Sequence, residues 1–248
     1  MSDTIDLKIG PIETSKNKVK TTEIQKCDII PKHPFRAVLS GRSGSGKSNL
    51  LINLLIQKHF YKNYFHFIFL ISPTAGKLDD SFIMLKKSKP KSKIAIINDL
   101  NPETIENIME TNKEIIEERE VHKAPRILII YDDVVSHKKF MNSRSFTQSF
   151  IASRHYNASV IICTQRYNSV PRVCRLQANA VFFFKGSNSE TEILAEEFCP
   201  AGYKKKEFLA VIDYAVKEPY NFLFINDTCK EHKHKYRKNL DQILELVK

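Results

Sequence analysis

The sequence predicts an α/β fold in which a mainly parallel sheet is covered by helices on both faces. From residue 35 onward, short apolar runs recur, and segments with a helical spacing of apolar residues lie between them. The runs are continuous rather than alternating, which is typical of strands that are buried on both faces. Regular alternation of strand and helix favours parallel pairing, and it places ligand sites beyond the carboxyl ends of the strands.

The chain has 248 residues, of which 42% are hydrophobic, and this is enough for one sizeable core. We expect a basic N-terminal arm over 1–32, one main α/β domain over 33–228, and a basic tail with a helix over 229–248. The expected strands are FRAVLSG (35–41), HFIFLIS (66–72), IAIIND (94–99), RILIIYDD (126–133), SVIICTQ (159–165), AVFFFK (180–185) and NFLFIND (221–227). The expected helices cover 47–58, 78–87, 102–120, 138–152, 189–198, 204–217 and 236–247.

The charge balance favours a polyanionic partner such as nucleic acid. Lys and Arg total 39 against 28 Asp and Glu, which gives a formal net charge of +11. The Lys-rich stretches 86–93 and 229–238 are either solvated loops or contacts with a phosphate backbone, and the sequence leaves both readings open.

Cysteine usage and hydropathy indicate where the chain resides. The five cysteines are odd in number, widely spaced and without a CxxC pair, so they favour a reducing compartment. The first ten residues contain no apolar signal segment, and no stretch is long and apolar enough to span a membrane. We therefore expect a soluble intracellular protein.

A GxxxxGKS motif follows the first strand and precedes an amphipathic helix, which is the context that a P-loop requires. In such a loop, backbone N–H groups and the helix N-terminus face the phosphates of a nucleotide. Lys47 is expected to reach the β and γ oxygens, and Ser48 to ligate Mg²⁺. We therefore predict ATP and Mg²⁺ as ligands. The predicted nucleotide-binding residues are Gly41, Arg42, Ser43, Gly44, Ser45, Gly46, Lys47 and Ser48.

An acidic pair ends the apolar strand RILIIYDD, in the manner of a Walker B motif. Asp132 is predicted to be the carboxylate on the metal side. Asp133 is predicted to polarise the water that attacks the γ-phosphate. Two expected strands lie between the P-loop and this pair in the sequence, which leaves room in the sheet for a strand inserted between the two motif strands.

That spacing and the acidic pair resemble the additional-strand, catalytic-acid class of P-loop ATPases, which includes RecA-like motors. The chain has no NKxD motif that reads guanine and no LSGGQ-type signature, so GTPases and ABC transporter subunits are less favoured.

The sequence after the acidic pair contains two further candidate site residues. Gln165, at the end of SVIICTQ, is a candidate sensor of the γ-phosphate or of the attacking water, although such a residue also suits a capped turn. Arg154 is the first candidate for an arginine finger that acts on a neighbouring subunit. Its rivals are Arg166, Arg172 and Arg175, and the alternative role is to complement a helix C-terminus.

Taken together, GRSGSGKS, IIYDD and SRHYNASVIICTQRYNSVPRVCRLQANAVFFF resemble the DNA-packaging ATPases of poxviruses, other large DNA viruses and virophages. These enzymes belong to the FtsK/HerA superfamily, and the resemblance covers roughly 35–227. It assigns 41–48 to Walker A, Asp132 and Asp133 to Walker B, Gln165 to the sensor and Arg154 to the finger. Many superfamily members have Asp-Glu where this chain has Asp132-Asp133, so the candidate base has a shorter side chain here.

The resemblance implies a homo-oligomeric ring that drives double-stranded DNA into a preformed capsid, with a capsid or capsid-vertex protein as a further partner. It also implies a location in the host cytoplasm, at the virus factory, and in the virion. Two alternatives remain open. One is a nucleotide-switch ATPase that controls assembly without translocation, and the other is a helicase or initiator-type ATPase.

Overall fold

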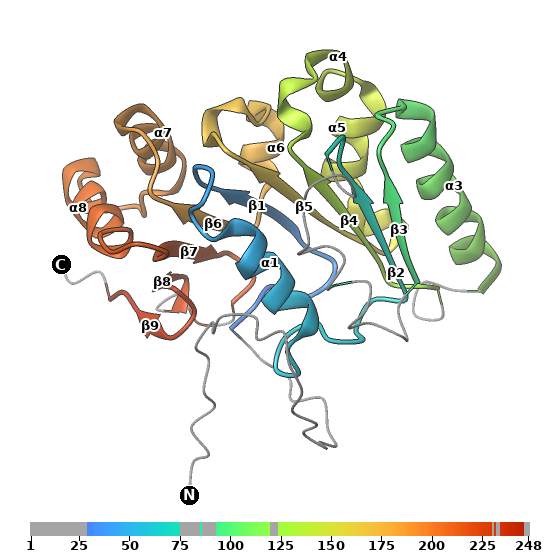
Figure 1. Cartoon of the computed structure of the whole chain (residues 1–248). Coiled ribbons are helices and arrows are strands. Elements are labelled where there is room, and N and C mark those ends of the chain that lie inside the picture. The colour runs from blue at the N-terminus through green and yellow to red at the C-terminus, as the bar shows by residue number, and fades with distance from the viewer. Residues whose placement is uncertain are drawn as a thin grey trace, which may run out of the picture.

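A twisted central sheet organises the computed structural model of the chain (Figure 1). The structure describes residues 29–74, 85, 93–119, 124–229, 231 and 234–245. Within these residues the strand order is β3-β2-β4-β5-β1-β6-β7-β8-β9. The strands are β1 (Arg36–Ser40), β2 (Phe67–Ile71), β3 (Lys93–Ile97), β4 (Ile127–Asp132), β5 (Ala158–Thr164), β6 (Ala180–Phe184), β7 (Phe222–Asn226), β8 (Tyr236–Lys238) and β9 (Gln242–Ile243).

The sheet is parallel from β3 to β6, and antiparallel from β6 to β9. All seven strands that the apolar runs predict are present. The predicted mainly parallel sheet is therefore confirmed, with an antiparallel extension at one edge.

Helices cover the two faces of the sheet unequally (Figure 1). The helices are α1 (Lys47–Ile56), α3 (Pro102–Arg119), η2 (Val134–Ser136), α4 (Lys138–Met141), α5 (Arg144–Ile151), η3 (Ser153–Tyr156), η4 (Tyr167–Ser169), α6 (Arg172–Gln177), α7 (Asn188–Phe198) and α8 (Lys205–Ala215). Among the described residues, α1 covers one face of the sheet, and its Leu50 and Leu54 share a core there with Phe65. The helices from α3 to α8 contribute to the core on the other face.

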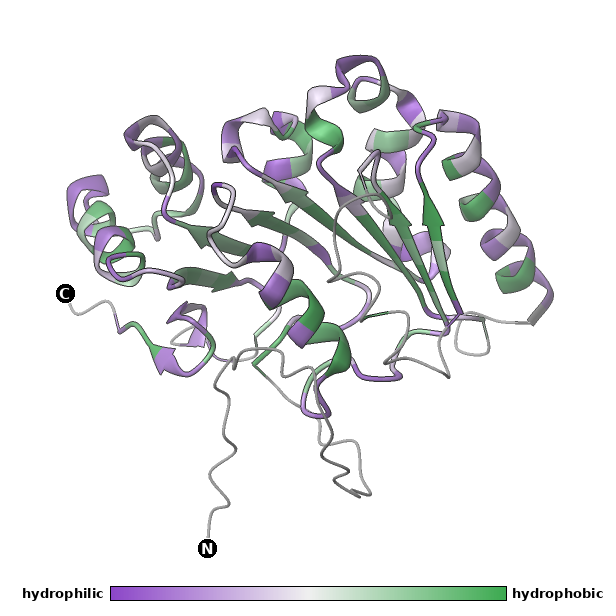
Figure 2. Cartoon of the chain, in the orientation of Figure 1, coloured by the Kyte–Doolittle hydropathy of each residue, from purple (hydrophilic) through white to green (hydrophobic). Residues whose placement is uncertain are grey.

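The central strands are apolar and buried on both faces. The strands form a continuous apolar layer in Figure 2, whereas the outer helices are apolar only toward the sheet. Every residue of β5 is buried, as is every residue of β6 and β7. Burial on both faces requires the continuous apolar runs that the sequence contains.

The inserted strand is β5, which lies between β1 and β4. The strand insertion that the sequence predicts is therefore present, and it comes from the segment after Asp133. The two strands that precede the acidic pair in the sequence, β2 and β3, lie beyond β4 at the edge of the sheet. This order is that of the predicted additional-strand fold.

The predicted helix over 236–247 is wrong. Residues of this segment form β8 and β9, which extend the sheet beside β7. The sheet thus continues past residue 228, and the predicted boundary between domain and tail falls inside it. Tyr236, Leu240 and Leu244 recur every four residues and are all buried, so the same spacing that suggests a helix serves a short hairpin.

Two smaller differences concern helices on the face of the sheet opposite α1. The predicted helix 138–152 is broken into α4 and α5, because the Ser143 side chain accepts a hydrogen bond from the Phe146 N–H and begins a new helix. Helix α6, which follows Pro171, was not predicted. Residues 1–28 of the predicted basic arm 1–32 lie outside the described residues, as do most of the predicted helix 78–87 and most of the Lys-rich stretch 86–93.

Within the described part of the chain, no helix is both long and apolar enough to cross a membrane.

Candidate nucleotide-binding site

Three neighbouring strands bring the predicted motifs to one edge of the sheet. The register pairs Ser40 of β1 with Thr164 of β5, and Cys163 of β5 with Asp132 of β4. The Gly41 N–H donates a hydrogen bond of 3.1 Å to the Thr164 carbonyl, which joins the start of the P-loop to the sensor strand. The loops after these three strands therefore lie next to one another, as the carboxyl ends of parallel strands require.

Glycine is required at specific positions of the P-loop. Gly46 has φ 100° and forms the N-cap of α1 without a side-chain cap. Gly44 has φ 74°. A Cβ at Gly41 would lie 2.6 Å from both Phe184 Cβ and Ser45 Oγ, so only glycine fits there. With no side chain capping its N-terminus and no acidic residue in its first turn, α1 presents its first N–H groups to an anion.

Lys47 lies folded over the loop that precedes it. Its Nζ donates hydrogen bonds to the carbonyls of Gly41 at 2.5 Å and Arg42 at 3.0 Å. Burial lowers the pKa of the Lys47 ammonium from its ordinary value, while the carboxylates of Asp132 and Asp133 act in the opposite direction. The cation is thus held inside the loop, where a phosphate would compete for it.

Asp132 is positioned by the neighbouring strand. The Ser72 hydroxyl, buried at the end of β2, donates a hydrogen bond of 3.3 Å to Asp132 Oδ2. Thr74 hydrogen-bonds with the same Ser72 hydroxyl. Sequence reasoning missed both residues, although each follows a predicted strand at the edge where the other motifs meet.

Asp133 has a left-handed backbone conformation, with φ 52° and ψ 21°. Gln165 Nε2 donates to its Oδ1 at 3.5 Å, the long limit of a hydrogen bond. Non-glycine residues rarely adopt positive φ, and such strain is concentrated at functional sites. Asp133 thus combines an unusual backbone conformation with a side-chain contact to Gln165, the sensor candidate.

One pocket of about 360 Å³ collects these groups. It is lined by Ser43, Gly44, Gly46, Lys47, Ser48, Asn49, Thr74, Asp132, Asp133 and Gln165. Most of the P-loop, both acidic residues and the sensor candidate are thus brought together. Asn49 and Thr74 are the lining residues that the sequence did not single out.

The groups that line this pocket fit a nucleotide with a magnesium ion. Ser45 belongs to the P-loop but does not line this pocket; its Oγ is buried and has no hydrogen-bond partner among the described residues. Ser48, Asp132 and Asp133 supply only oxygen donors, the type that Mg²⁺ prefers. Burial raises the pKa of the Cys163 thiol beside them, so this cysteine stays neutral and offers no thiolate ligand.

The four arginine candidates lie in different parts of the fold. Arg154 is exposed in η3, which precedes β5, so it lies at the edge of the sheet opposite the P-loop. Arg166 and Arg172 are exposed beyond the carboxyl end of β5. Arg175 is buried, with its Nε 2.9 Å from Glu197 Oε1, so it is a structural residue. None of the four lines the pocket within its own chain.

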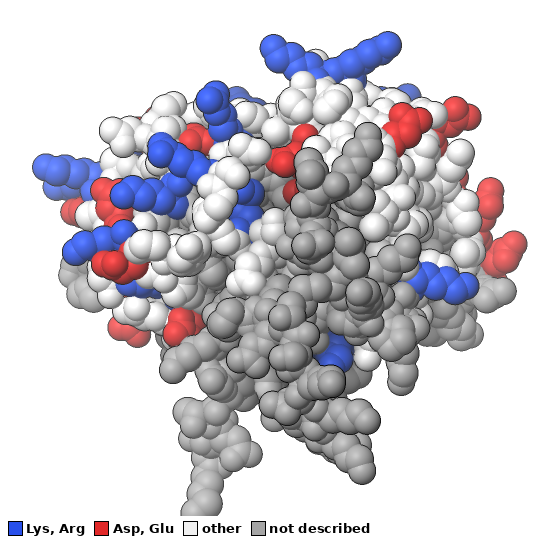
Figure 3. Space-filling model, viewed as in Figure 1, with Lys and Arg blue, Asp and Glu red and all other residues white. Residues whose placement is uncertain are grey.

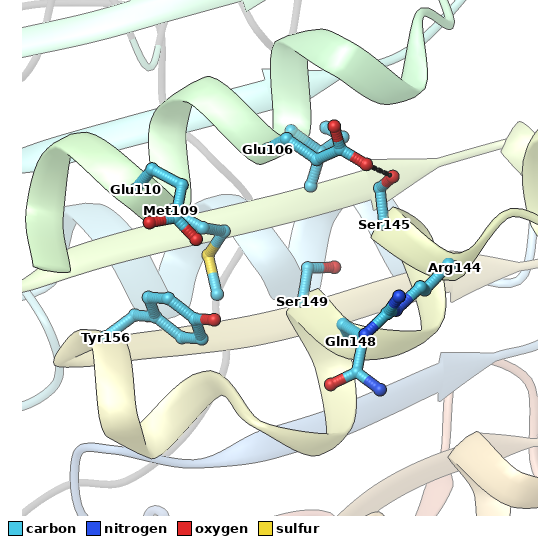
Figure 4. A pocket seen from close by; sticks show the side chains of 9 residues that line it. Glu106, Met109, Glu110, Arg144, Ser145, Gln148, Ser149 and Tyr156 are labelled. Atoms are coloured by element: carbon cyan, nitrogen blue, oxygen red, sulfur yellow. Dashed lines mark hydrogen bonds between the residues drawn. The ribbon is translucent and has the colours of Figure 1, made fainter.

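A second pocket, of about 260 Å³, lies between α3 and α5 (Figure 4). Ser145 on α5 donates a hydrogen bond of 2.5 Å to Glu106 on α3, and Arg144 and Tyr156 also line the pocket. It shares no residue with the P-loop pocket, and it does not contain any predicted site residue.

Comparison with protein families finds one model that matches residues 24–243, described as "Poxvirus A32 protein". The chain is 30% identical over 187 residues to "DNA packaging protein OPG160" of variola virus, a match that covers 73% of this chain and 64% of the relative. The monkeypox virus protein of the same name matches at the same identity, with 58% of its length covered. The chain thus spans about three-fifths of the length of these relatives.

Solved structures share the fold at lower identity. The DNA-packaging ATPase B204 from Sulfolobus turreted icosahedral virus superposes with a TM-score of 0.58 at 17% identity, covering 84% of this chain and 97% of that one. The genome packaging NTPase B204 from Sulfolobus turreted icosahedral virus 2, solved with ATP-gammaS, gives 0.56 at 18% identity, covering 86% and 100%. EssC (ATPases 2 and 3) from Geobacillus thermodenitrificans gives 0.54 at 16% identity, covering 78% and 38%.

Proposed function

The chain belongs to the poxvirus A32 protein family, and from that premise we propose that it is an Mg²⁺-dependent ATPase that drives double-stranded DNA into a preformed viral capsid. One observation carries the proposal: Lys47, Asp133 and Gln165 line the same pocket at the carboxyl edge of the sheet. The names of the relatives support packaging as the use of the hydrolysis.

The residues of the pocket have separate tasks in hydrolysis. The N–H groups of the P-loop bind the phosphates, and Lys47 neutralises the charge that develops on the β and γ oxygens. Asp133 accepts a proton from the attacking water, and Gln165 orients that water in line with the γ-phosphate. The hydrogen bond between these two side chains supports a shared action on one water molecule.

Ser48 and Asp132 would hold Mg²⁺, which would supply positive charge to the phosphate oxygens. The hydrogen bond from Ser72 fixes one oxygen of Asp132, so that the carboxylate is oriented before the metal arrives.

Double-stranded DNA is the proposed polyanionic partner. The net charge of +11 favours it, and Lys and Arg side chains lie along the top and left of the view in Figure 3; Asp and Glu side chains lie among those on the left and also over α3. Lys138 and Lys139 are exposed on α4, shortly after the catalytic Asp133. A phosphate contact there would link DNA to the end of β4 through the short η2 segment.

We propose that the active form is a homo-oligomeric ring docked on a capsid or capsid-vertex protein, in the host cytoplasm and in the virion. An arginine finger must come from outside the pocket, since none of the candidate arginines lines it in its own chain. Arg154, exposed on the opposite edge, is suited to a head-to-tail contact in which one edge of a subunit meets the nucleotide of the next.

Triplex displacement tests the translocation directly. A third strand bound to duplex DNA should be released with ATP by the wild-type protein, and retained with Lys47→Ala or without Mg²⁺. A forked duplex tested in parallel should stay paired. Unwinding of the fork would instead identify a helicase, and retention of the third strand during active hydrolysis would contradict translocation.

A further inference from the structure

Two hollows meet along the P-loop. The first hollow is the pocket that contains Lys47 and Asp133, and the second hollow adjoins the P-loop on the side away from the acidic pair. It has a volume of about 350 Å³, within the range of small-ligand sites. It is lined by Arg42, Ser43, Gly44, Ser45, Phe184, Lys185, Val216, Lys217, Glu218, Pro219, Tyr220 and Asn221. Ser43 and Gly44 line both hollows, so the two are continuous along the P-loop. Sequence reasoning assigned no role to the segment 216–221.

The topology explains why this segment reaches the nucleotide. Strand β7 runs antiparallel to β6, with Phe222 paired to Phe184. The loop that precedes β7 therefore arrives at the same edge of the sheet as the P-loop. Two hydrogen bonds with Asn239 hold the end of the loop: its Nδ2 donates to Asn221 Oδ1 at 3.0 Å, and its Oδ1 accepts from the Phe222 N–H at 3.2 Å.

Tyr220 is the unusual residue of this loop. Its side chain is 71% exposed, the most exposed of the large hydrophobic residues that the structure describes. Its φ is 65°, a conformation that is rare for a residue with a bulky side chain. A Cβ at Gly46 would lie 3.4 Å from Tyr220 Cδ1, so the ring lies beside the last glycine of the P-loop. The backbone thus holds an aromatic ring in solvent, next to the phosphate site.

The order of the groups along the two hollows matches the shape of a nucleoside triphosphate. The γ-phosphate end is fixed by Asp133 and Gln165 at the far side of the first hollow. The ribose and base must then leave the P-loop in the other direction, toward the second hollow. We propose that this hollow receives the base of the bound nucleotide, which stacks on the ring of Tyr220; this inference rests on the proposed ATPase function.

The chemistry of the hollow predicts weak discrimination between bases. Every base has a π-face, so stacking on an aromatic ring tolerates all of them. The exposed charged residues that line the hollow are Arg42, Lys185, Lys217 and Glu218. Their long side chains are not preorganised to read base edges. ATP and GTP should therefore both gain affinity from Tyr220, and tripolyphosphate, which has no base, should gain none.

The sequence contains no tryptophan, so Tyr220→Trp places the single tryptophan of the chain at the proposed platform, where its indole emission can be excited selectively. Its emission should change on addition of ATP, ADP or GTP with Mg²⁺, and should not respond to tripolyphosphate. Tyr203→Trp is the matched control, since Tyr203 lies before the start of α8, at the opposite end of that helix from the loop. An unresponsive indole in the Tyr220→Trp variant, or equal responses in the two variants, would overturn the inference.

Binding constants give a second readout. Tyr220→Asn removes the ring while keeping a residue type that tolerates positive φ. It should raise the Kd for ATP roughly tenfold, within the range that stacking contributes, and leave the Kd for tripolyphosphate unchanged. Tyr220→Phe should bind ATP as the wild type does.

Four outcomes would contradict the assignment in distinguishable ways. Equal weakening of ATP and tripolyphosphate by Tyr220→Asn would mean that the loop only supports the P-loop. If Tyr220→Asn lost DNA binding and kept ATP binding, Tyr220 would be a DNA contact instead. A wild-type protein that binds tripolyphosphate but gains nothing from a base overturns this inference alone, whereas a wild-type protein that binds neither overturns the ATPase proposal as well.

Discussion

Gln165 and Asp133 meet across two adjacent strand ends, with 3.5 Å between Gln165 Nε2 and Asp133 Oδ1. Asp133 follows β4 and Gln165 follows β5, the strand inserted between the two motif strands. Asp133 makes this contact from a left-handed backbone conformation, directly after the last residue of β4. An amide and a carboxylate placed together in this way can hold one water molecule between them.

Asp133→Asn should separate nucleotide binding from hydrolysis. Asparagine tolerates the left-handed conformation, so the fold should persist, but it cannot accept the proton of the attacking water. We expect single-turnover hydrolysis to fall by about 10²- to 10⁴-fold, with the Kd for ATP unchanged. Asp213→Asn, at an exposed position on α8, is the control. A near-normal rate in Asp133→Asn would remove this residue from the role of base.

Arg154→Ala should abolish hydrolysis without weakening ATP binding, because its position opposite the P-loop restricts it to an action on a neighbouring subunit. Mixing it with Lys47→Ala, which is itself inactive but retains Arg154, should restore part of the activity. We expect an arginine finger to supply about 10³-fold or more in rate. If mixing restores nothing, the same experiment with Arg166→Ala and Arg172→Ala would identify the finger among the other exposed candidates.

Two adjacent glutamates should differ sharply in their effect on stability. Glu197 accepts hydrogen bonds from Arg175 Nε at 2.9 Å and from the Tyr167 hydroxyl at 2.7 Å, and both charged side chains are nearly buried. Glu197→Gln leaves the Arg175 cation without a counter-charge, and should lower the free energy of unfolding by about 3–5 kcal/mol. This can be measured by urea denaturation.

The control for that change is Glu196→Gln, which removes an exposed ion pair with Lys205. Its denaturation midpoint should match that of the wild type, because solvent screens such pairs. Equal effects at the two positions would show that the network around Arg175 does not hold α7 against the loop after β5.

His33 should make stability depend on pH. Its Nε2 contacts Asn157 Oδ1 at 2.9 Å and its Nδ1 contacts Ser159 Oγ at 2.7 Å. Burial, with Arg126 and His66 nearby, lowers its pKa from 6.5 to about 4. The folded state therefore resists a proton that the unfolded state accepts, so stability is complete above pH 6.5 and falls as the pH drops toward 4.

The expected loss is on the order of 3 kcal/mol when the drop is complete. Urea denaturation of the wild type and of His33→Gln at pH 7, 6 and 5 measures it, since glutamine keeps hydrogen-bonding groups and does not titrate. The wild type should lose more stability than the variant over this range. Parallel profiles would show that another group is responsible.

Much of this fold can be predicted from the sequence because the central strands are buried on both faces. A strand such as β5, in which all seven residues are buried, needs a mainly apolar sequence, here with Ser159 and Thr164 as its buried polar residues, and this pattern is visible without knowledge of the neighbouring strands. The P-loop and the acidic pair are equally local, since each is a short stretch at the end of such a strand. Their meeting in one pocket then follows from parallel pairing.

The parts that local patterns missed depend on tertiary structure. The segment 236–247 has apolar residues at a helical spacing, yet the open edge of β7 offers backbone partners, and pairing with that edge outweighs the local preference. Ser72 and Thr74 acquire a role only because β2 lies next to β4. Tyr220 reaches the P-loop because β7 reverses the direction of the sheet, which no motif in the sequence indicates.

The central claim is that this chain hydrolyses ATP in order to move duplex DNA. Steady-state ATP hydrolysis with and without double-stranded DNA, at low salt and over a range of protein concentrations, tests it most directly, with Lys47→Ala as the blank. The account predicts turnover that is stimulated by duplex DNA and that rises more steeply than protein concentration, as an assembling ring requires. Turnover that is indifferent to both DNA and concentration would contradict it.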